Sequence, residues 1–351
     1  KVTKASTNHI FGAGIRILKG MEEVYGYTNN ISLEGLLDLA GNLSAFFVGE
    51  PVDIAFDLKL EEIKTAHPIL RRPSDVSASE KVAYMSRGYE ASKSVSPEVS
   101  QVVSNVMDKE QNVWIANTEG KFVHDTRTYV RFAHSVIASA NGQMQRSFEG
   151  PGAYRGYEFL DDMQIEELAK DVADIAIKML HADEMKGQVL PVVVHNAFGG
   201  VLLHEACVHS LEATLVAKGA SVFSNRLNQK IASDIVTAVD DGTHPNAWGS
   251  LNVDDEGNPT KRNVLIENGV LKSYLVDYRN DRRMQHGITG SGRRESYKYS
   301  PTSRMRRHHI LSIHLWLVSG WRPIRIVQKA HTSGLFRNPY PLSLKYSQQV
   351  A

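Results

Sequence analysis

The sequence has almost no cysteine, almost no net charge and no long hydrophobic run. Cys207 is the only cysteine among 351 residues, which excludes an intramolecular disulfide and favours a reducing compartment. The 40 Lys and Arg residues nearly balance the 39 Asp and Glu residues, so no global field attracts nucleic acid or an anionic membrane. No stretch approaches the roughly 20 apolar residues that span a bilayer. We therefore expect a soluble cytoplasmic protein without nucleic-acid or membrane partners.

The last part of the chain differs from the rest in charge. Residues 306–351 contain seven Lys and Arg and no Asp or Glu, which leaves 33 basic and 39 acidic residues elsewhere. This tail holds Trp316 and Trp321 and has no helical or strand period. It could be a basic nucleic-acid arm, a membrane-surface segment around 310–318, or sequence read out of frame. We favour the last, because basic arms are usually richer in Lys and Gly, and we expect the tail to pack poorly.

The first half of the chain alternates between strand and helix patterns. At roughly 100 to 200 residues per domain, the length suggests about two domains. Apolar and polar residues alternate around the Asn141-Gly142 turn signal, which is typical of antiparallel strands. The patterns predict a hairpin over 12–28, helices over 32–47, 79–92 and 165–179, a meander over 101–148 and a strand over 189–194.

Two histidines and a glutamate follow the last of these strands. His204, Glu205 and His209 lie in a helical pattern, and zinc peptidases use such a helix to supply two imidazole ligands and a general base. Residues five apart lie about 140° apart around a regular helix, which is poor geometry for sharing one ion. A metal site therefore requires a π-type bulge or a kink. The alternative is two ordinary helix histidines with a solvated Glu205.

These residues resemble the zinc-protease motif of the TldD/PmbA family, closest to its TldD branch. The motif His204-Glu205-x-x-x-His209 continues through Ser210-Leu211-Glu212-Ala213, as in that family. The resemblance covers about residues 8–305. Further similar stretches lie at 12–16, 148–152, 218–223, 239–243, 254–260, 263–269 and 289–297.

The resemblance implies a metallopeptidase that cleaves unfolded or flexible peptides inside a dimer. The dimer would be a homodimer or a heterodimer with a related TldE/PmbA subunit. His204 and His209 would bind Zn²⁺, and Glu205 would be the general base. The family takes a third ligand, a cysteine, from a more C-terminal strand, and this sequence has no such cysteine. A catalytically inactive member that serves as a structural dimer subunit, or a truncated product without stable function, is the alternative.

The resemblance stops at Met305, where the unusual tail begins. Composition and resemblance thus agree that the tail replaces the normal end of the catalytic domain, most simply through a frameshift. The predicted fold class is α+β. It comprises an N-terminal domain of antiparallel strands and helices (1–187), an incomplete β-rich catalytic domain entered through the metal-binding helix (188–305), and the tail (306–351).

Several other residues have competing interpretations. Cys207 could replace the missing ligand, although a small cysteine in a helix more often packs in the core. The family motif usually has glycine at Val208, and a β-branched residue makes a helix distortion harder. Residues 254–257 read as a hairpin turn, because an EF-hand would need Glu where Leu265 stands. Residues 240–243 read as a further turn, which could lie close behind the metal ligands. We expect a substrate-facing loop, rather than a phosphate cradle, at Gly290, Ser291, Gly292 and Arg293.

Overall fold

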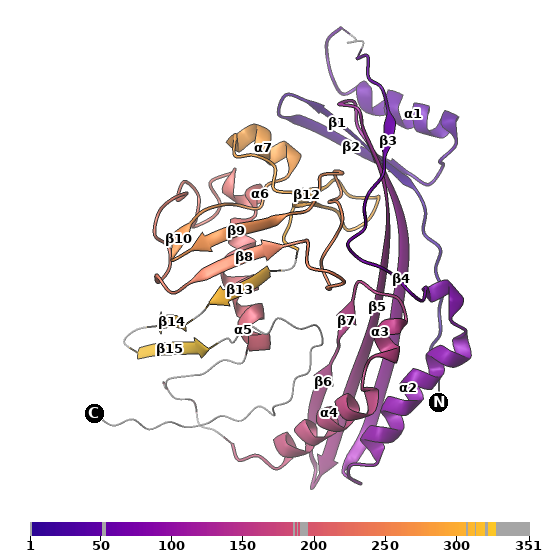
Figure 1. The fold of residues 1–351 in the computed structure, drawn as a ribbon, viewed down its shortest axis with the longest axis vertical. Helices are drawn as coiled ribbons and strands as arrows, with labels where there is room; N and C mark the ends of the chain where they lie inside the picture. Colours follow the sequence, from indigo (N-terminus) through magenta and orange to yellow (C-terminus); the bar gives the residue numbers. More distant parts are fainter. Residues whose placement is uncertain are drawn as a thin grey trace.

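The structure has an α+β fold, as the sequence predicts, in which a long sheet with helices precedes a smaller β-rich part (Figure 1). The computed structural model describes residues 2–50, 54–184, 187, 189, 196–306, 308–312, 314–319 and 322–327. The predicted strand at 189–194 lies outside these residues, except for its first position. Within the described ranges, no helix is both long enough and apolar enough to cross a membrane.

The predicted hairpin and its capped helix open the chain. Gly20 in the hairpin turn has a φ of 61°, a left-handed conformation that glycine adopts without steric cost. The Ser32 hydroxyl accepts a hydrogen bond from the Gly35 N–H and caps the helix. The helix ends somewhat before Phe47, its predicted end. The bounds are β1 (Ala13–Lys19), β2 (Glu22–Thr28) and α1 (Leu33–Ser44).

The predicted meander forms the central sheet, in which β5 lies between β4 on one side and β3, β7 and β6 on the other. Asn141 and Gly142 both have positive φ, the backbone that a tight two-residue hairpin turn requires. The turn therefore fixes the β5–β6 register. The strands are β3 (Lys59–Glu61), β4 (Val99–Ala116), β5 (Lys121–Ala140), β6 (Gln143–Glu149) and β7 (Gly152–Ala153).

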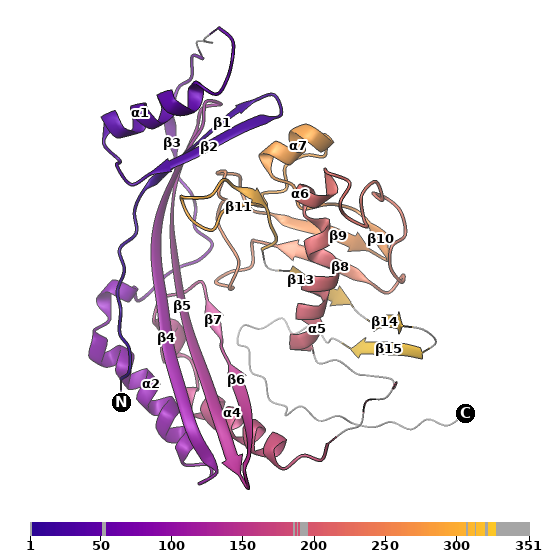
Figure 2. The ribbon, with the colours of Figure 1, turned by 180° about the vertical axis from the view of Figure 1, so that it is seen from behind.

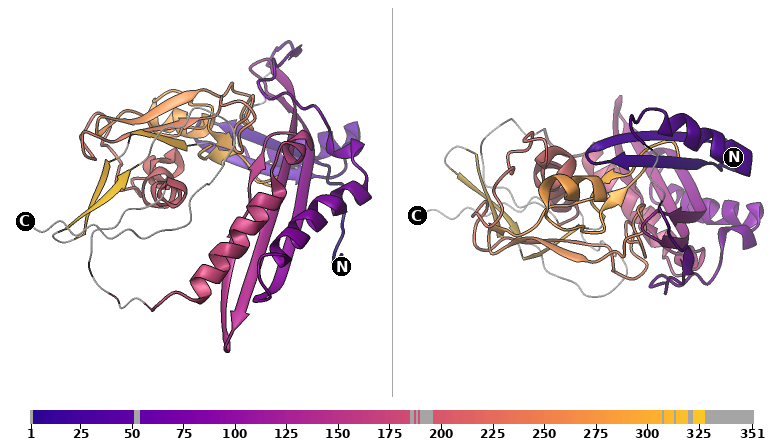
Figure 3. Two further views of the ribbon diagram at one scale, coloured as in Figure 1. Left: turned by 60° about the horizontal axis from the view of Figure 1, so that its bottom comes forward. Right: turned by 90° about the horizontal axis from the view of Figure 1, so that it is seen from above.

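Two long helices cover one face of this sheet, and Figures 2 and 3 show both of them along the same side. Ser77 and Glu80 form a reciprocal capping box at the start of α2. The apolar residues of α4 recur at steps of three and four and are buried against the strands. The helical elements here are η1 (Pro73–Asp75), α2 (Ala78–Lys93), α3 (Glu158–Asp161) and α4 (Ile165–Leu180).

The second part of the chain is built on a sheet in the order β10-β9-β8-β13, with α5 packed beside it. Its apolar core includes Val208 and Leu211 from the histidine segment and Leu265 and Leu275 from the strands and loops around it. The elements are α5 (Asn196–Leu203), α6 (Ala213–Val216), β8 (Thr237–Asp241), β9 (Arg262–Glu267), β10 (Val270–Leu271), α7 (Tyr278–Met284), β11 (Gly292–Arg293), β12 (Thr302–Ser303), β13 (His308–Ser312), β14 (His314–Ser319) and β15 (Arg322–Val327).

The first residues of the tail are built into this sheet. The backbone of β13 pairs antiparallel with β8. The Arg306 guanidinium lies 2.9 Å from the Asp240 carboxylate, and both side chains are fully buried. Asp240 therefore belongs to a strand, which corrects its assignment to a turn. The turn follows Asp241, the last residue of β8, whose carboxylate accepts a hydrogen bond from the Thr243 N–H.

The acidic loop, which we define as Asp254, Asp255 and Glu256, joins the two parts of the molecule. A tight turn is present as predicted, but all three side chains are buried rather than solvated. Asp255 contacts Arg127 of β5 at 2.5 Å, and Glu256 contacts Arg16 of β1 at 2.7 Å. These carboxylates therefore hold the second part of the chain against both the central sheet and the hairpin.

Candidate metal centre

The helix that carries the two histidines is irregular at the predicted place. Regular α-helix ends at Leu203, and a π-helical turn spans His204–Val208 before a 3-10 turn at His209–Leu211. The His209 N–H donates to the His204 carbonyl, a step of five residues instead of four. The extra residue in the turn brings side chains five apart to one side of the helix. The predicted bulge is confirmed, and it forms although Val208 replaces the family's usual glycine.

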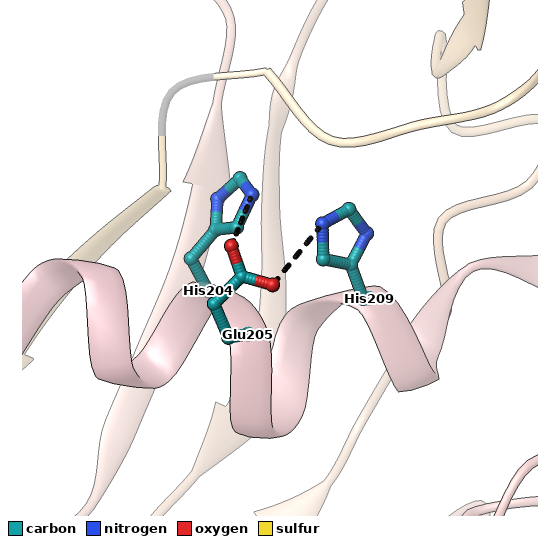
Figure 4. A group of neighbouring side chains, drawn as sticks. All are labelled: His204, Glu205 and His209. Carbon is teal, nitrogen blue, oxygen red and sulfur yellow. Dashed lines mark ion pairs between the residues drawn. The ribbon is translucent and has the colours of Figure 1, made fainter.

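The three predicted side chains converge on one point (Figure 4). The ligand atoms of His204, Glu205 and His209 all lie within 4.8 Å of one another. Glu205 places one oxygen 4.0 Å from His204 Nε2 and the other 3.9 Å from His209 Nε2. The two imidazole rings are nearly perpendicular, with their centroids 4.5 Å apart. Both imidazoles are partly shielded, whereas the Glu205 side chain is 67% exposed and open to a water or substrate.

A buried glutamate fixes the second histidine. His209 Nδ1 lies 3.0 Å from Glu212 Oε1, and a carboxylate can only accept, so Nδ1 carries the proton. The lone pair of Nε2 therefore points toward the cluster, the arrangement that metal-binding histidines usually adopt. Arg304 Nη1 lies 3.5 Å from the other Glu212 oxygen. Burial raises the pKa of Glu212, with Arg304 and His209 acting in the opposite direction.

The surroundings of His204 lower its pKa, which suits a role as a metal ligand. Burial lowers the pKa of His204, and the neighbouring His209 lowers it further. A lowered pKa keeps the imidazole neutral, and only a neutral imidazole can donate its lone pair to a metal ion. The contact with Glu212 thus orients the His209 ring, and burial favours the neutral form of His204, both of which suit a metal ligand.

The donor set fits a catalytic zinc ion in part. Such a site has three protein ligands and one open position, and nitrogen and carboxylate oxygen are accepted donors. In the part of the chain that the structure describes, no further His, Cys, Asp or Glu joins the cluster. Cys207 instead packs against the apolar core, where burial raises its pKa to about 11. The two histidines could thus supply two ligands, and Glu205 could serve as a weak third or as a base.

The structure places residues 290–293 in the interior. Gly290 and Ser291 are buried, and the Gly292 N–H donates to Asp254 Oδ2 at 3.0 Å. A Cβ on Gly292 would lie 2.6 Å from a Glu256 carboxylate oxygen, so glycine is required for close packing. Arg293 pairs with Asp255 at 3.3 Å. These contacts give the segment a structural role, and direct contact with a substrate stays a prediction.

Glu212 and Arg304 are functional candidates beyond the predicted set. Glu212 follows His209 by three residues, one helical turn, and this spacing could have marked it as a partner of the histidine. Arg304 gave no such signal, because β12 and the loop before it bring it to Glu212. The Arg304 N–H donates to the Ser291 carbonyl, so residues 290–293 help to position Arg304.

Comparison with known families gives matches along most of the chain. Domain 1 of the PmbA/TldA metallopeptidases matches residues 1–45, the central domain matches residues 71–180 and the C-terminal domain matches residues 186–314. The predicted N-terminal domain, 1–187, thus spans the first two matches. The third extends past Met305 and includes β13.

Individual proteins agree with these matches. The metalloprotease TldD homolog of Buchnera aphidicola is 33% identical over 308 residues, which cover 86% of this chain and 64% of that protein. A metalloprotease of Methanothermobacter thermautotrophicus is 31% identical over 275 residues, 78% of this chain and 60% of that protein. The crystal structure of TldE from Thermococcus kodakarensis superposes with a TM-score of 0.62 at 17% identity, covering 84% of this chain and 66% of that one. This chain therefore spans less than two thirds of the length of the two metalloproteases.

Proposed function

This chain belongs to the PmbA/TldD metallopeptidase family, and on that basis we propose that it is a zinc-dependent peptidase acting on unfolded or flexible peptides in the cytoplasm. The observation that carries the proposal is the convergence of His204, Glu205 and His209 across the π-helical turn. A regular helix would separate the histidines, and the bulge instead brings both rings to one side, where they could serve one ligand.

The proposed mechanism assigns one role to each side chain. His204 and His209 would hold Zn²⁺ through Nε2, and the bound ion would supply Lewis-acid polarisation of the scissile carbonyl and of a water molecule. Glu205 would take a proton from the attacking water and return it to the leaving amine. Glu212 would act through His209, since it fixes the proton on Nδ1 and the direction of the ring. The exposure of the Glu205 side chain would allow water to reach it and protons to be transferred.

We propose that the peptidase acts as a dimer, either with a second copy of itself or with a TldE/PmbA-like subunit. The similarity to the TldE structure supports a partnership within the family. The second candidate function is that of an inactive structural subunit, and the lack of a third His, Cys or Asp ligand in the described part favours it.

Metal content and cleavage distinguish the two candidates. Purified protein should contain about one zinc per chain by mass spectrometry, and it should cleave a fluorogenic unfolded peptide. Glu205→Gln should keep the metal and lose cleavage, whereas His204→Ala should lose both. Protein without metal and without cleavage, even after incubation with Zn²⁺, would support the structural subunit instead.

A further inference from the structure

A cavity lies beyond the histidine helix, where the β1–β2 hairpin meets α6 and α7. Its volume is about 250 Å³, the share of roughly eight liquid waters, so it can hold a carboxylate together with a small side chain. Three cationic residues and two acidic residues line it, namely Lys218, Arg279, Arg283, Glu23 and Asp277. Ligand sites often form at such junctions between domains.

Both acidic residues accept hydrogen bonds from protein groups, but only Glu23 forms an ion pair among the described residues. Glu23 lies 3.2 Å from Arg279 Nη1, and it accepts a hydrogen bond from Ser300 at 2.6 Å. Asp277 accepts hydrogen bonds from Asn280 and Ser303. Glu23 thus neutralises Arg279, whereas Asp277 is held at Oδ1 by neutral donors and offsets one of the two other cationic residues.

The other cationic groups have no such partner. Among the described residues, neither Lys218 nor Arg283 contacts a carboxylate, and Arg283 makes only a long bond of 3.4 Å to the Asn280 side-chain oxygen. The buried Arg279 Nε–H also lacks an acceptor. The five ionisable residues that line the cavity thus carry a net formal charge of +1, and this charge together with the unused N–H donors favours an anion.

The cavity adjoins the candidate metal centre through two short stretches of chain. Thr214 lines it and lies two residues after Glu212, a span of at most about 7 Å. Thr302 also lines it and lies two residues before Arg304, and the two threonine hydroxyls are 2.6 Å apart. The groups that hold His209 are therefore next to the residues that line the cavity.

We propose that this cavity binds a carboxylate of the peptide substrate, with Lys218 and Arg283 as specificity-determining residues. The inference rests on the proposed peptidase function. A guanidinium offers two parallel N–H donors that match a carboxylate, and the lysine ammonium adds a second charge. The carboxylate is either the C-terminus of the peptide or an acidic side chain, and the cavity would position the peptide relative to Glu205.

Peptide binding tests the proposal independently of cleavage. The Glu205→Gln chain prevents turnover, and fluorescence anisotropy then measures affinity for labelled six-residue peptides of Gly, Ala and Ser. Three forms are compared: a free C-terminal acid, a C-terminal amide, and an amide with one internal Glu. At least one carboxylate-containing form should bind about tenfold more tightly than the plain amide. Preference for the free acid alone identifies the C-terminus as the source, and preference for the Glu peptide identifies a side chain.

Variants assign the effect to the cavity. Arg283→Gln and Lys218→Gln should each remove most of the tenfold preference, while zinc content stays unchanged. Arg262→Gln removes the same charge from an exposed position of β9 and should leave the preference intact. Equal affinity for all three peptides, or equal losses in the Arg262 control, would overturn the proposal. Failure of the peptidase function would instead appear as absent cleavage by the unmodified chain, whatever the binding results.

Discussion

The acidic loop and the histidine helix, which we define as residues 196–211, both bring ionisable side chains together. The carboxylates of the acidic loop are buried, whereas Glu205 of the histidine helix is exposed. Asp255 has a side chain that is 4% exposed and is held by Arg127 and Arg293. Glu205 is 67% exposed, and among the described residues its ion-pair contacts are the two imidazoles at 3.9 and 4.0 Å. A carboxylate whose oxygens are all paired stabilises the fold, whereas a carboxylate with free lone pairs can exchange protons. The comparison therefore distinguishes carboxylates that stabilise the fold from a carboxylate that is available for proton transfer.

The largest effect should follow from removing Asp255. Asp255→Ala leaves the Arg127 guanidinium buried with one fewer partner, and such loss usually costs about 3–5 kcal/mol of unfolding free energy. Urea denaturation followed by circular dichroism measures the change. Asp234→Ala is the matched control, because it removes a carboxylate from an exposed pair with Lys230. A similar stability for both variants would contradict the structural role of the acidic loop.

Glu256 should make the stability of the acidic loop depend on pH. Burial raises the pKa of Glu256 to about 7 from its ordinary 4.5, and Arg16 only partly opposes the shift. As pH rises, Glu256 ionises first in the unfolded chain. Its contribution to the unfolding free energy is therefore complete below pH 4.5 and decreases as pH rises to about 7.

Glu256→Gln should remove this dependence. The difference in unfolding free energy between the variant and the unmodified chain should shift by about 2–3 kcal/mol in favour of the variant as pH rises from 4.5 to 8. Denaturation curves at several pH values measure the difference, and Asp234→Ala again serves as the control. Parallel pH profiles for the Gln variant and the unmodified chain would show that Glu256 titrates normally.

A smaller effect should appear at the histidine helix when Glu212 is changed. Glu212→Ala removes the acceptor for His209 Nδ1–H, and the loss of such a partner typically weakens metal binding 10–100-fold. Competition with a chromophoric zinc chelator measures the affinity. Glu212→Gln retains an oxygen acceptor and should lose less. Unchanged affinity in the alanine variant would mean that the His209 ring is held by other contacts.

Much of the fold followed from local patterns in the sequence. Alternating residues predicted the β4–β6 meander, and the positive φ of Asn141 and Gly142 matches their turn signal. The apolar spacing of α4 predicted its buried face. Local patterns failed where burial depends on distant partners: Asp240 reads as a turn residue, but Arg306 allows it to lie in a buried strand.

The candidate site could be predicted only in part. The pair His204 and His209 was visible from residue types and resemblance, and their spacing required the bulge that the structure contains. Arg304 could not be foreseen, because strand pairing brings it to Glu212 from far along the chain. The sequence suggested that Gly292 belongs to a binding loop, and substrate contact there stays a prediction. The structure gives a further reason for glycine at this position, because the Glu256 carboxylate packs against it.

The smallest effect on stability should come from Glu205, the residue proposed to matter most for chemistry. Glu205→Gln changes an exposed side chain that has no close hydrogen-bond partner in the described part of the chain, so the unfolding free energy should change by less than about 0.5 kcal/mol. The same urea experiment that detects Asp255→Ala measures it, and a peptide assay on the same samples should find no cleavage. A large loss of stability in Glu205→Gln would mean that this carboxylate, like those of the acidic loop, holds the fold together. Full stability with no cleavage would instead place its role in the reaction alone.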